Sequence, residues 1–158
     1  MVERITEIYS LLVPLLDGRL IIPRSCVAEV VGFQQPSEMP GAPPWYLGMF
    51  AWSNRQIPLI SFEGTCGQTI PPLTGRTRVV VLFALGAQIE GGYYGIVSQG
   101  FPQLVRVGAD VIRPDASYVP PEDCPIVCRV RMLNETPWIP DLDRLEVLIA
   151  DETTASAA

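Results

Sequence analysis

The chain contains neither histidine nor lysine among its 158 residues. Without histidine it lacks the commonest general base, the commonest metal ligand and the usual activator of a serine or cysteine nucleophile. All 11 positive charges are arginines, and 17 acidic residues bring the net charge to −6. A nucleic-acid-binding surface needs a basic stripe. We therefore expect a protein that is not an enzyme, has no cofactor or metal, and does not bind nucleic acid.

Long hydrophobic runs are also missing. The longest apolar stretch, Val79–Leu85, is far shorter than the roughly 20 residues of a membrane-spanning helix. Near the N-terminus, the apolar run Leu11–Leu16 is stopped by Asp17 and Gly18, which is too early for a signal peptide. The sequence therefore predicts a cytoplasmic protein that does not insert into a membrane.

Cysteine is sparse, with four residues at positions 26, 66, 124 and 128. In the cytoplasm we expect all four to be reduced thiols that contribute to packing. The alternative is a zinc site based on Cys124 and Cys128, with Cys26 and Cys66 as the remaining ligands.

Turn residues punctuate the chain at short intervals and predict β-hairpins. These turns are expected at Asp17-Gly18, Asn54-Arg55, Gly91-Gly92 and Asn134-Glu135. Clusters among the 16 prolines mark loops and sheet edges. Short strands at this spacing predict an all-β sandwich or small barrels. Helix is expected only as one or two short turns, and residues 151–158 are predicted to form a disordered tail.

The order of the elements repeats loosely along the chain. A strand, a turn and a hairpin occur over residues 20–62, and a similar series occurs over residues 93–142. The repetition indicates two similar barrels.

Several segments then resemble the CheW-like domain in their order and spacing, over roughly residues 8–149. They are Val27–Val31, Met39–Pro43, Leu47–Phe62, Gly95–Val97, Ile112–Pro114 and Trp138–Leu145. The resemblance implies two intertwined five-stranded SH3-like β-barrels with an apolar groove between them. We expect one domain over residues 1–150, with 18–75 plus 145–150 in the first barrel and 5–16 plus 76–142 in the second.

Members of this family are adaptors without catalytic activity. They couple methyl-accepting chemoreceptors to a CheA-type histidine kinase, whose regulatory domain has the same fold. The resemblance therefore implies three kinds of partner: the cytoplasmic tip of a chemoreceptor, the kinase regulatory domain and other CheW-like proteins.

This chain departs from the family pattern at three charged positions. It has Ser53-Asn54 where the family has Arg-Gly, and Ser61 and Gln99 where the family has Asp. We interpret the chain as a divergent accessory member, of the kind that serves type IV pili or another specialised chemosensory system.

The family pattern also predicts which residues bind partners. In the first barrel these are Val27, Glu29, Val30 and Phe33, with Ile96 and Val97 facing them from the second barrel and the hairpin tip formed by Trp52, Ser53, Asn54 and Arg55. Trp and Arg are enriched at interface hot spots. The alternative function is a β-barrel module unrelated to chemotaxis. It would bind a peptide or small ligand through Trp45 and Tyr46, presented by the stiff Pro40–Pro44 loop.

Overall fold

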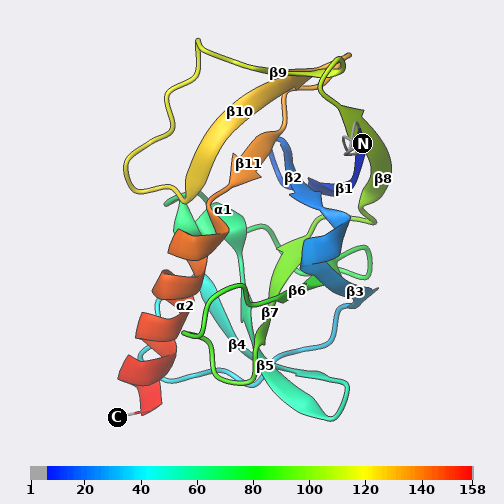
Figure 1. Cartoon of the computed structure of the whole chain (residues 1–158). Coiled ribbons are helices and arrows are strands. Elements are labelled where there is room, and N and C mark those ends of the chain that lie inside the picture. The colour runs from blue at the N-terminus through cyan, green and yellow to red at the C-terminus, as the bar shows by residue number, and fades with distance from the viewer. Residues whose placement is uncertain (1–6, 158) are drawn as a thin grey trace.

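The computed structural model describes residues 7–157, whose strands form two sheets (Figure 1). Within these residues, the six-stranded sheet contains, in spatial order, β8 (Gln103–Gly108), β1 (Glu7–Pro14), β2 (Arg19–Pro23), β11 (Trp138–Pro140), β10 (Ile126–Met132) and β9 (Ile112–Pro114). The five-stranded sheet contains β3 (Val27–Gly32), β6 (Arg78–Phe83), β7 (Tyr93–Ser98), β5 (Arg55–Ile60) and β4 (Tyr46–Trp52). The helical elements are η1 (Arg24–Cys26), α1 (Phe62–Thr65) and α2 (Leu142–Ala157).

Two of the predicted turns have the backbone geometry that their residues favour. Ser53 and Asn54 join β4 to β5 with φ values of 49° and 59°, as the two central residues of a type I′ hairpin require. The turn therefore lies one residue earlier than predicted. Gly91 and Gly92, at φ 88° and 79°, lead into β7, where glycine adopts positive φ without a steric penalty.

The turn between β1 and β2 is of a different kind from the one predicted. The Leu15 N–H donates to the Gly18 carbonyl at 2.8 Å, but Gly18 is not left-handed. A β-carbon built on Gly18 would lie 2.5 Å from Cη2 of Trp138. Glycine is needed here because the indole ring covers the backbone, not because φ is positive.

The main hydrophobic core fills the space between the two sheets and α2. It includes Leu20 and Ile22 from β2, Ile60 from β5, Tyr94 and Ile96 from β7, and Leu145 and Ile149 from α2. Leu145 and Ile149 are four residues apart, so both project from one face of the helix. Burying a side chain of this size contributes roughly 1.5–3 kcal/mol to the free energy of unfolding. Because the buried side chains come from both sheets and from α2, this core joins all three layers.

Helix α2 corrects two predictions about the C-terminus. The helix has 16 residues and continues to Ala157, where the sequence predicted one short turn and a disordered tail; Ala158 lies outside the described residues. At its start, Asp141 Oδ1 accepts the Arg144 N–H at 3.1 Å, as an N-cap residue does. Near its end, Thr153 Oγ1 lies 2.7 Å from the Tyr46 hydroxyl. Tertiary contacts thus stabilise as a helix a segment whose small residues had predicted a disordered tail. Among residues 7–157, no helix is long and apolar enough to cross a membrane.

The sheets group the strands differently from the predicted barrel boundaries. Strands β6 and β7, assigned to the second barrel, pair with β3 and β5 in the five-stranded sheet. Strand β2, assigned to the first barrel, pairs with β1, for example Leu12 with Ile21. The sheet pairing therefore does not follow the predicted division at residues 75 and 76, because the β1–β2 hairpin stays in one sheet and the β6–β7 hairpin pairs with β3 and β5.

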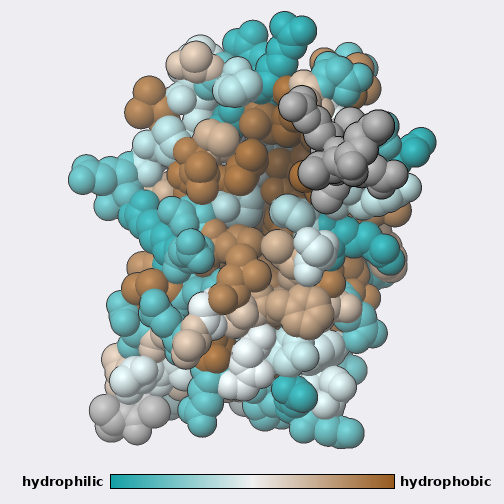
Figure 2. All heavy atoms as spheres, viewed as in Figure 1, coloured by the Kyte–Doolittle hydropathy of each residue, from teal (hydrophilic) through white to brown (hydrophobic). Residues whose placement is uncertain are grey.

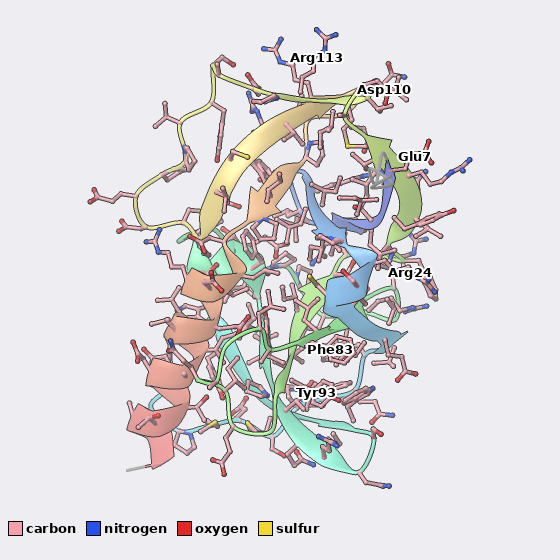
Figure 3. All side chains as sticks on the ribbon, in the orientation of Figure 1. Glu7, Arg24, Phe83, Tyr93, Asp110 and Arg113 are labelled. Atoms are coloured by element: carbon pink, nitrogen blue, oxygen red, sulfur yellow. A yellow bond between two sulfur atoms is a disulfide. The ribbon has the colours of Figure 1, made fainter. Side chains whose placement is uncertain are left out.

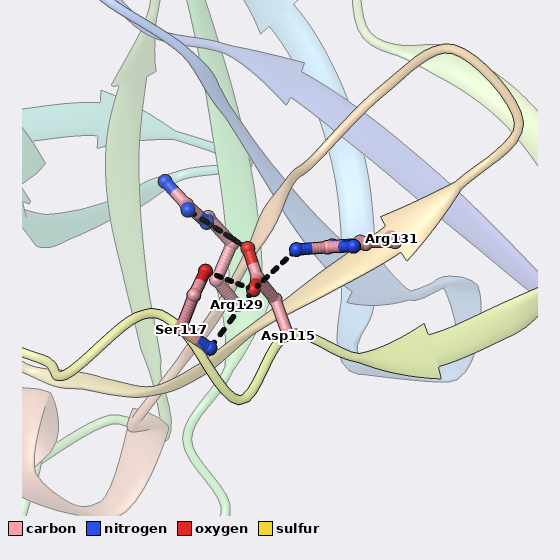
Figure 4. A network of polar contacts seen from close by, with 4 residues as sticks. All are labelled: Asp115, Ser117, Arg129 and Arg131. Atoms are coloured by element: carbon pink, nitrogen blue, oxygen red, sulfur yellow. Dashed lines mark hydrogen bonds and ion pairs between the residues drawn. The ribbon is translucent and has the colours of Figure 1, made fainter.

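A buried carboxylate fixes the start of the loop 115–125, which joins β9 to β10 (Figure 4). The Asp115 side chain is 1% exposed and accepts hydrogen bonds from the Ser117 N–H at 3.1 Å, Arg129 Nε at 2.8 Å and Arg131 Nη2 at 3.1 Å. The Ser117 hydroxyl and the two guanidinium groups hold the pKa of Asp115 well below its usual range.

Two of the four cysteines are bonded to each other. Cys66, directly after α1, forms a disulfide with Cys124, at the end of the loop 115–125. Cys26 and Cys128 are free thiols. The prediction of four reduced thiols is therefore wrong for Cys66 and Cys124. The zinc alternative also fails, because neither of these sulfurs is available as a thiolate ligand.

Candidate protein-docking surface

A groove separates β1 of the six-stranded sheet from β3 of the five-stranded sheet. Its volume is about 750 Å³, and its lining is mostly apolar: Ile8, Tyr9, Leu11, Arg24, Ser25, Val27, Ala28, Glu29, Val30 and Phe83. We call this feature the β1–β3 groove. Figure 2 shows hydrophobic surface gathered in the middle of the face on which the two sheets meet, with hydrophilic surface on both sides. Strand β3 is an edge strand, so its backbone and side chains are both accessible to a partner.

Aromatic residues form the rim of this groove on the five-stranded sheet. The Trp52 ring lies 5.0 Å from the Tyr93 ring, which lies 5.5 Å from the Phe83 ring. Trp52 Nε1 donates to Glu29 Oε2 at 2.8 Å, and the Arg55 guanidinium lies 4.9 Å from the Tyr93 ring centroid. Figure 3 shows Phe83 and Tyr93 side by side. We call these five residues the Trp52 cluster. The ring pairs are tilted by 56° and 43°, and such aromatic pairs and a cation–π contact each contribute about 0.5–1.5 kcal/mol.

The structure brings together most of the residues predicted to bind partners. Val27, Glu29 and Val30 line the β1–β3 groove, and Trp52 and Arg55 belong to the Trp52 cluster. Ser53 and Asn54 are exposed at the adjoining hairpin tip. Phe33 is separate: it is half-buried against the core formed by residues such as Phe50 and Val79. Seven of the ten predicted residues therefore lie in the groove or around its rim, whereas Phe33, Ile96 and Val97 do not.

Two predicted binding residues lie in the core instead. Ile96 is fully buried and Val97 is 2% exposed. Both belong to β7, which lies between β6 and β5 and is covered on both faces. The prediction that they face the groove is wrong, because the main core covers Ile96 on one face of β7 and the core around Phe50 and Val79 covers Val97 on the other.

The sequence reasoning missed the wall of the groove that β1 provides. Ile8 and Tyr9 line the groove and are 53% and 52% exposed. It also missed Phe83 and Tyr93, which are paired across the β6–β7 hairpin. A two-residue turn at Gly91-Gly92 would have placed Glu90 opposite Tyr93, whereas residues 84–92 all lie in the connection between Phe83 and Tyr93. No local signal marks Ile8 and Tyr9, because their exposure depends on the neighbouring sheet.

The Pro-rich loop does not present its aromatic residues to solvent. Tyr46 is 4% exposed, and its hydroxyl bonds to Thr153. Trp45 packs against the main core, and a β-carbon on Gly64 would lie 2.6 Å from Trp45 Cβ. The alternative site at Trp45 and Tyr46 was therefore wrong, because both rings are structural.

A family model of the CheW-like domain matches residues 10–127. The chain belongs to the CheW-like family. Among solved structures it is similar to the scaffolding protein TtCheW from Thermoanaerobacter tengcongensis, with 14% sequence identity and a TM-score of 0.71 over 87% of this chain and 86% of that one. No curated protein matches the sequence. The structural likeness confirms the predicted all-β class and the pair of SH3-like barrels.

Local contacts explain two of the departures from the CheW-like pattern. Ser61 caps α1, with Ser61 Oγ accepting the Gly64 N–H at 3.3 Å, a role that Asp would also fill. Gln99 lies beside the buried Glu63, with Gln99 Nε2 3.5 Å from Glu63 Oε2. Burial raises the pKa of Glu63, and an Asp at position 99 would add a second negative charge. These neutral residues therefore suit the buried surroundings of α1.

Proposed function

We propose that this protein is a chemosensory adaptor, which holds the cytoplasmic tip of a methyl-accepting chemoreceptor in the β1–β3 groove and links it to a CheA-type histidine kinase. The observation that carries the proposal is an apolar groove between the two sheets of a CheW-like domain, with the Trp52 cluster on its rim. The protein acts by binding alone. It functions in the cytoplasm, where the receptor tip contacts the kinase.

The shape and chemistry of the groove support a helical partner. Its walls are apolar, while Arg24 and Glu29 supply opposite charges within the same lining. A groove of this kind accepts an amphipathic helix whose apolar face packs inside and whose charged residues select orientation. We infer that the receptor tip presents a helix of this kind to the groove.

The hairpin tip supports a second contact, with the kinase regulatory domain or another CheW-like protein. Ser53 replaces the family arginine, but Arg55 places a guanidinium two residues further on, over the Tyr93 ring. Its Nη1 also reaches the Gly91 carbonyl at 3.4 Å, so the charge is held close to the rim. We infer that the shifted charge changes partner choice, which fits an accessory adaptor of a type IV pilus or similar system.

The test is direct binding of the purified protein to a receptor cytoplasmic-tip fragment from the same cells, measured by calorimetry. Tyr9→Glu places a charge in the groove at an exposed position. We expect it to weaken binding by about tenfold or more, equivalent to about 1.4 kcal/mol. Val147→Glu is the matched control, because Val147 is an exposed apolar residue of α2 that lies outside the groove lining.

Two results would contradict the proposal. The first is equal affinity of the wild type and Tyr9→Glu for the fragment. The second is failure of the wild-type protein to bind either the fragment or the kinase regulatory domain, with circular dichroism showing that it is folded.

A further inference from the structure

The disulfide between Cys66 and Cys124 joins the two halves of the protein. Cys66 follows α1, which is attached to the five-stranded sheet through the Ser61 N–H···Trp45 carbonyl hydrogen bond at 2.8 Å. Cys124 precedes β10 of the six-stranded sheet. The two cysteines are 58 residues apart in sequence. We propose that this disulfide is a redox-sensitive staple that a dithiol reductant opens, and that its state controls the β1–β3 groove.

On the six-stranded side, the staple holds a loop with few other attachments. The loop 115–125 contains no helix or strand, and the Asp115 network anchors its first residues. At its other end, Arg144 Nη1 donates to the Cys124 carbonyl at 3.2 Å, and the Asp141 N–H donates to the Pro125 carbonyl at 2.8 Å. Figure 1 shows this loop descending to α1 and the start of α2. Opening the disulfide would leave the loop held by the Asp115 network, by the Arg129 guanidinium 4.6 Å from the Tyr118 ring centroid, and by hydrogen bonds from Arg144.

On the other side, the staple holds α1, which contacts the turn after β1. Glu63 in α1 accepts the Leu16 N–H at 3.0 Å, and Leu16 lies two residues beyond the end of β1 at Pro14. The other end of β1 supplies Ile8 and Tyr9 to the groove. The disulfide is thus linked through α1 and β1 to one wall of the groove. Loosening α1 would remove one of the contacts that fix the end of β1 relative to the five-stranded sheet.

The two cysteines differ in exposure, and the more exposed one offers a reductant a point of attack. Cys124 is 3% exposed, whereas Cys66 is half-buried at the surface. A reductant thiolate would attack Cys66 Sγ and break the S–S bond, and Cys124 would leave as a thiolate and take a proton from water. The second thiol of the reductant would then displace Cys66. Two electrons pass to the protein, which ends with two thiols, and the reductant ends as a disulfide.

The first arm of the test counts thiols in the full chain without denaturant. Isolation with N-ethylmaleimide present should modify two cysteines, and prior dithiothreitol treatment should expose four. Cys26→Ser/Cys128→Ser is the matched control, which should change from none to two. Four reactive thiols before reduction, after equilibration with oxidised dithiothreitol, would overturn the proposal. So would a disulfide that only denaturant makes reducible, because it would then be purely structural.

The second arm measures what the staple does to the protein alone. Reduction should lower the Tm by roughly 10 °C, because a long closed loop is released, and should speed hydrogen exchange in residues 62–66 and 115–125. Cys66→Ser/Cys124→Ser should have the Tm and hydrogen-exchange rates of the reduced protein, and dithiothreitol should change neither. Identical exchange in the oxidised and reduced wild type would overturn the staple.

The third arm rests on the proposed function and measures receptor-tip affinity in both states. We expect reduction to weaken binding about fivefold or more, with no change in Cys66→Ser/Cys124→Ser. Equal affinity in both states would overturn control of the groove. If neither state binds the tip while the first two arms succeed, the proposed function fails and the redox-sensitive staple stands.

Discussion

Substituting Gly18 by alanine sets two opposite effects against each other. Alanine restricts the unfolded chain, which stabilises a protein by about 0.4–1 kcal/mol where the native backbone accepts it. The added methyl group would lie 2.5 Å from Trp138 Cη2, well inside van der Waals contact. Overpacking of this kind costs about 1–3 kcal/mol. Because Trp138 packs against the main core, the ring cannot move away freely, and we expect a net loss of about 1–2 kcal/mol.

Gly32→Ala is the matched control, since a β-carbon on Gly32 has nothing within 4 Å and its φ is not left-handed. We expect this variant to gain a few tenths of a kcal/mol or more. The difference between the two variants should be about 2 kcal/mol, or roughly 4–8 °C in Tm for a chain of this size.

Urea unfolding without reductant measures both variants, with equal m-values required for the comparison. Trp138→Phe removes the part of the ring nearest Gly18, so Gly18→Ala should cost about 1 kcal/mol less in that background. The reasoning is refuted if Gly18→Ala is as stable as Gly32→Ala, or if its cost is the same with phenylalanine at position 138.

Four further substitutions test other parts of the structure. Leu133→Gly should stabilise by about 1 kcal/mol in thermal unfolding, because Leu133 is 94% exposed at φ 38° and leucine is strained there; a loss would refute the strain. Glu63→Gln should stabilise at pH 7 and progressively less toward pH 5 in urea titrations. Burial raises the pKa of the folded Glu63 carboxyl, so the wild type loses stability as pH rises through that pKa, and a pH-independent difference would contradict this. Trp52→Phe should cost about 1 kcal/mol by removing the hydrogen bond to Glu29, and an equal cost in a Glu29→Ala background, which has no acceptor, would refute that cause. Val97→Glu should unfold the protein, since Val97 is 2% exposed; a native circular dichroism spectrum would disprove its burial.

Some residues that the family resemblance singled out do lie together in the structure. Val27, Glu29 and Val30 line the β1–β3 groove, and their role in binding a partner stays a prediction. Trp52 and Arg55 flank a turn whose residues favour positive φ, so the hairpin tip could be located closely. Neither inference depended on which strands are neighbours.

The same reasoning failed where packing between layers decides exposure. The sequence Tyr94–Val97 does not indicate whether either face of its strand is free, and here core side chains cover both faces of β7. The α2 helix was missed because residues 150–157 look like a polar, small-residue tail. Its buried positions, Leu145 and Ile149, become a helical face only when the core is present to receive them.

The sequence by itself determined the local structure and the available side-chain chemistry of this protein. It specifies short strands and turns at glycine and asparagine, and it supplies no histidine or lysine. These properties are local, since they depend on residue type and near neighbours. The tertiary structure alone decided that β1 faces β3 across the groove and that Cys66 meets Cys124 across 58 residues. Contacts between such distant segments follow from the order of strands in the two sheets, which is set by the total packing of the core and by no single stretch of the chain.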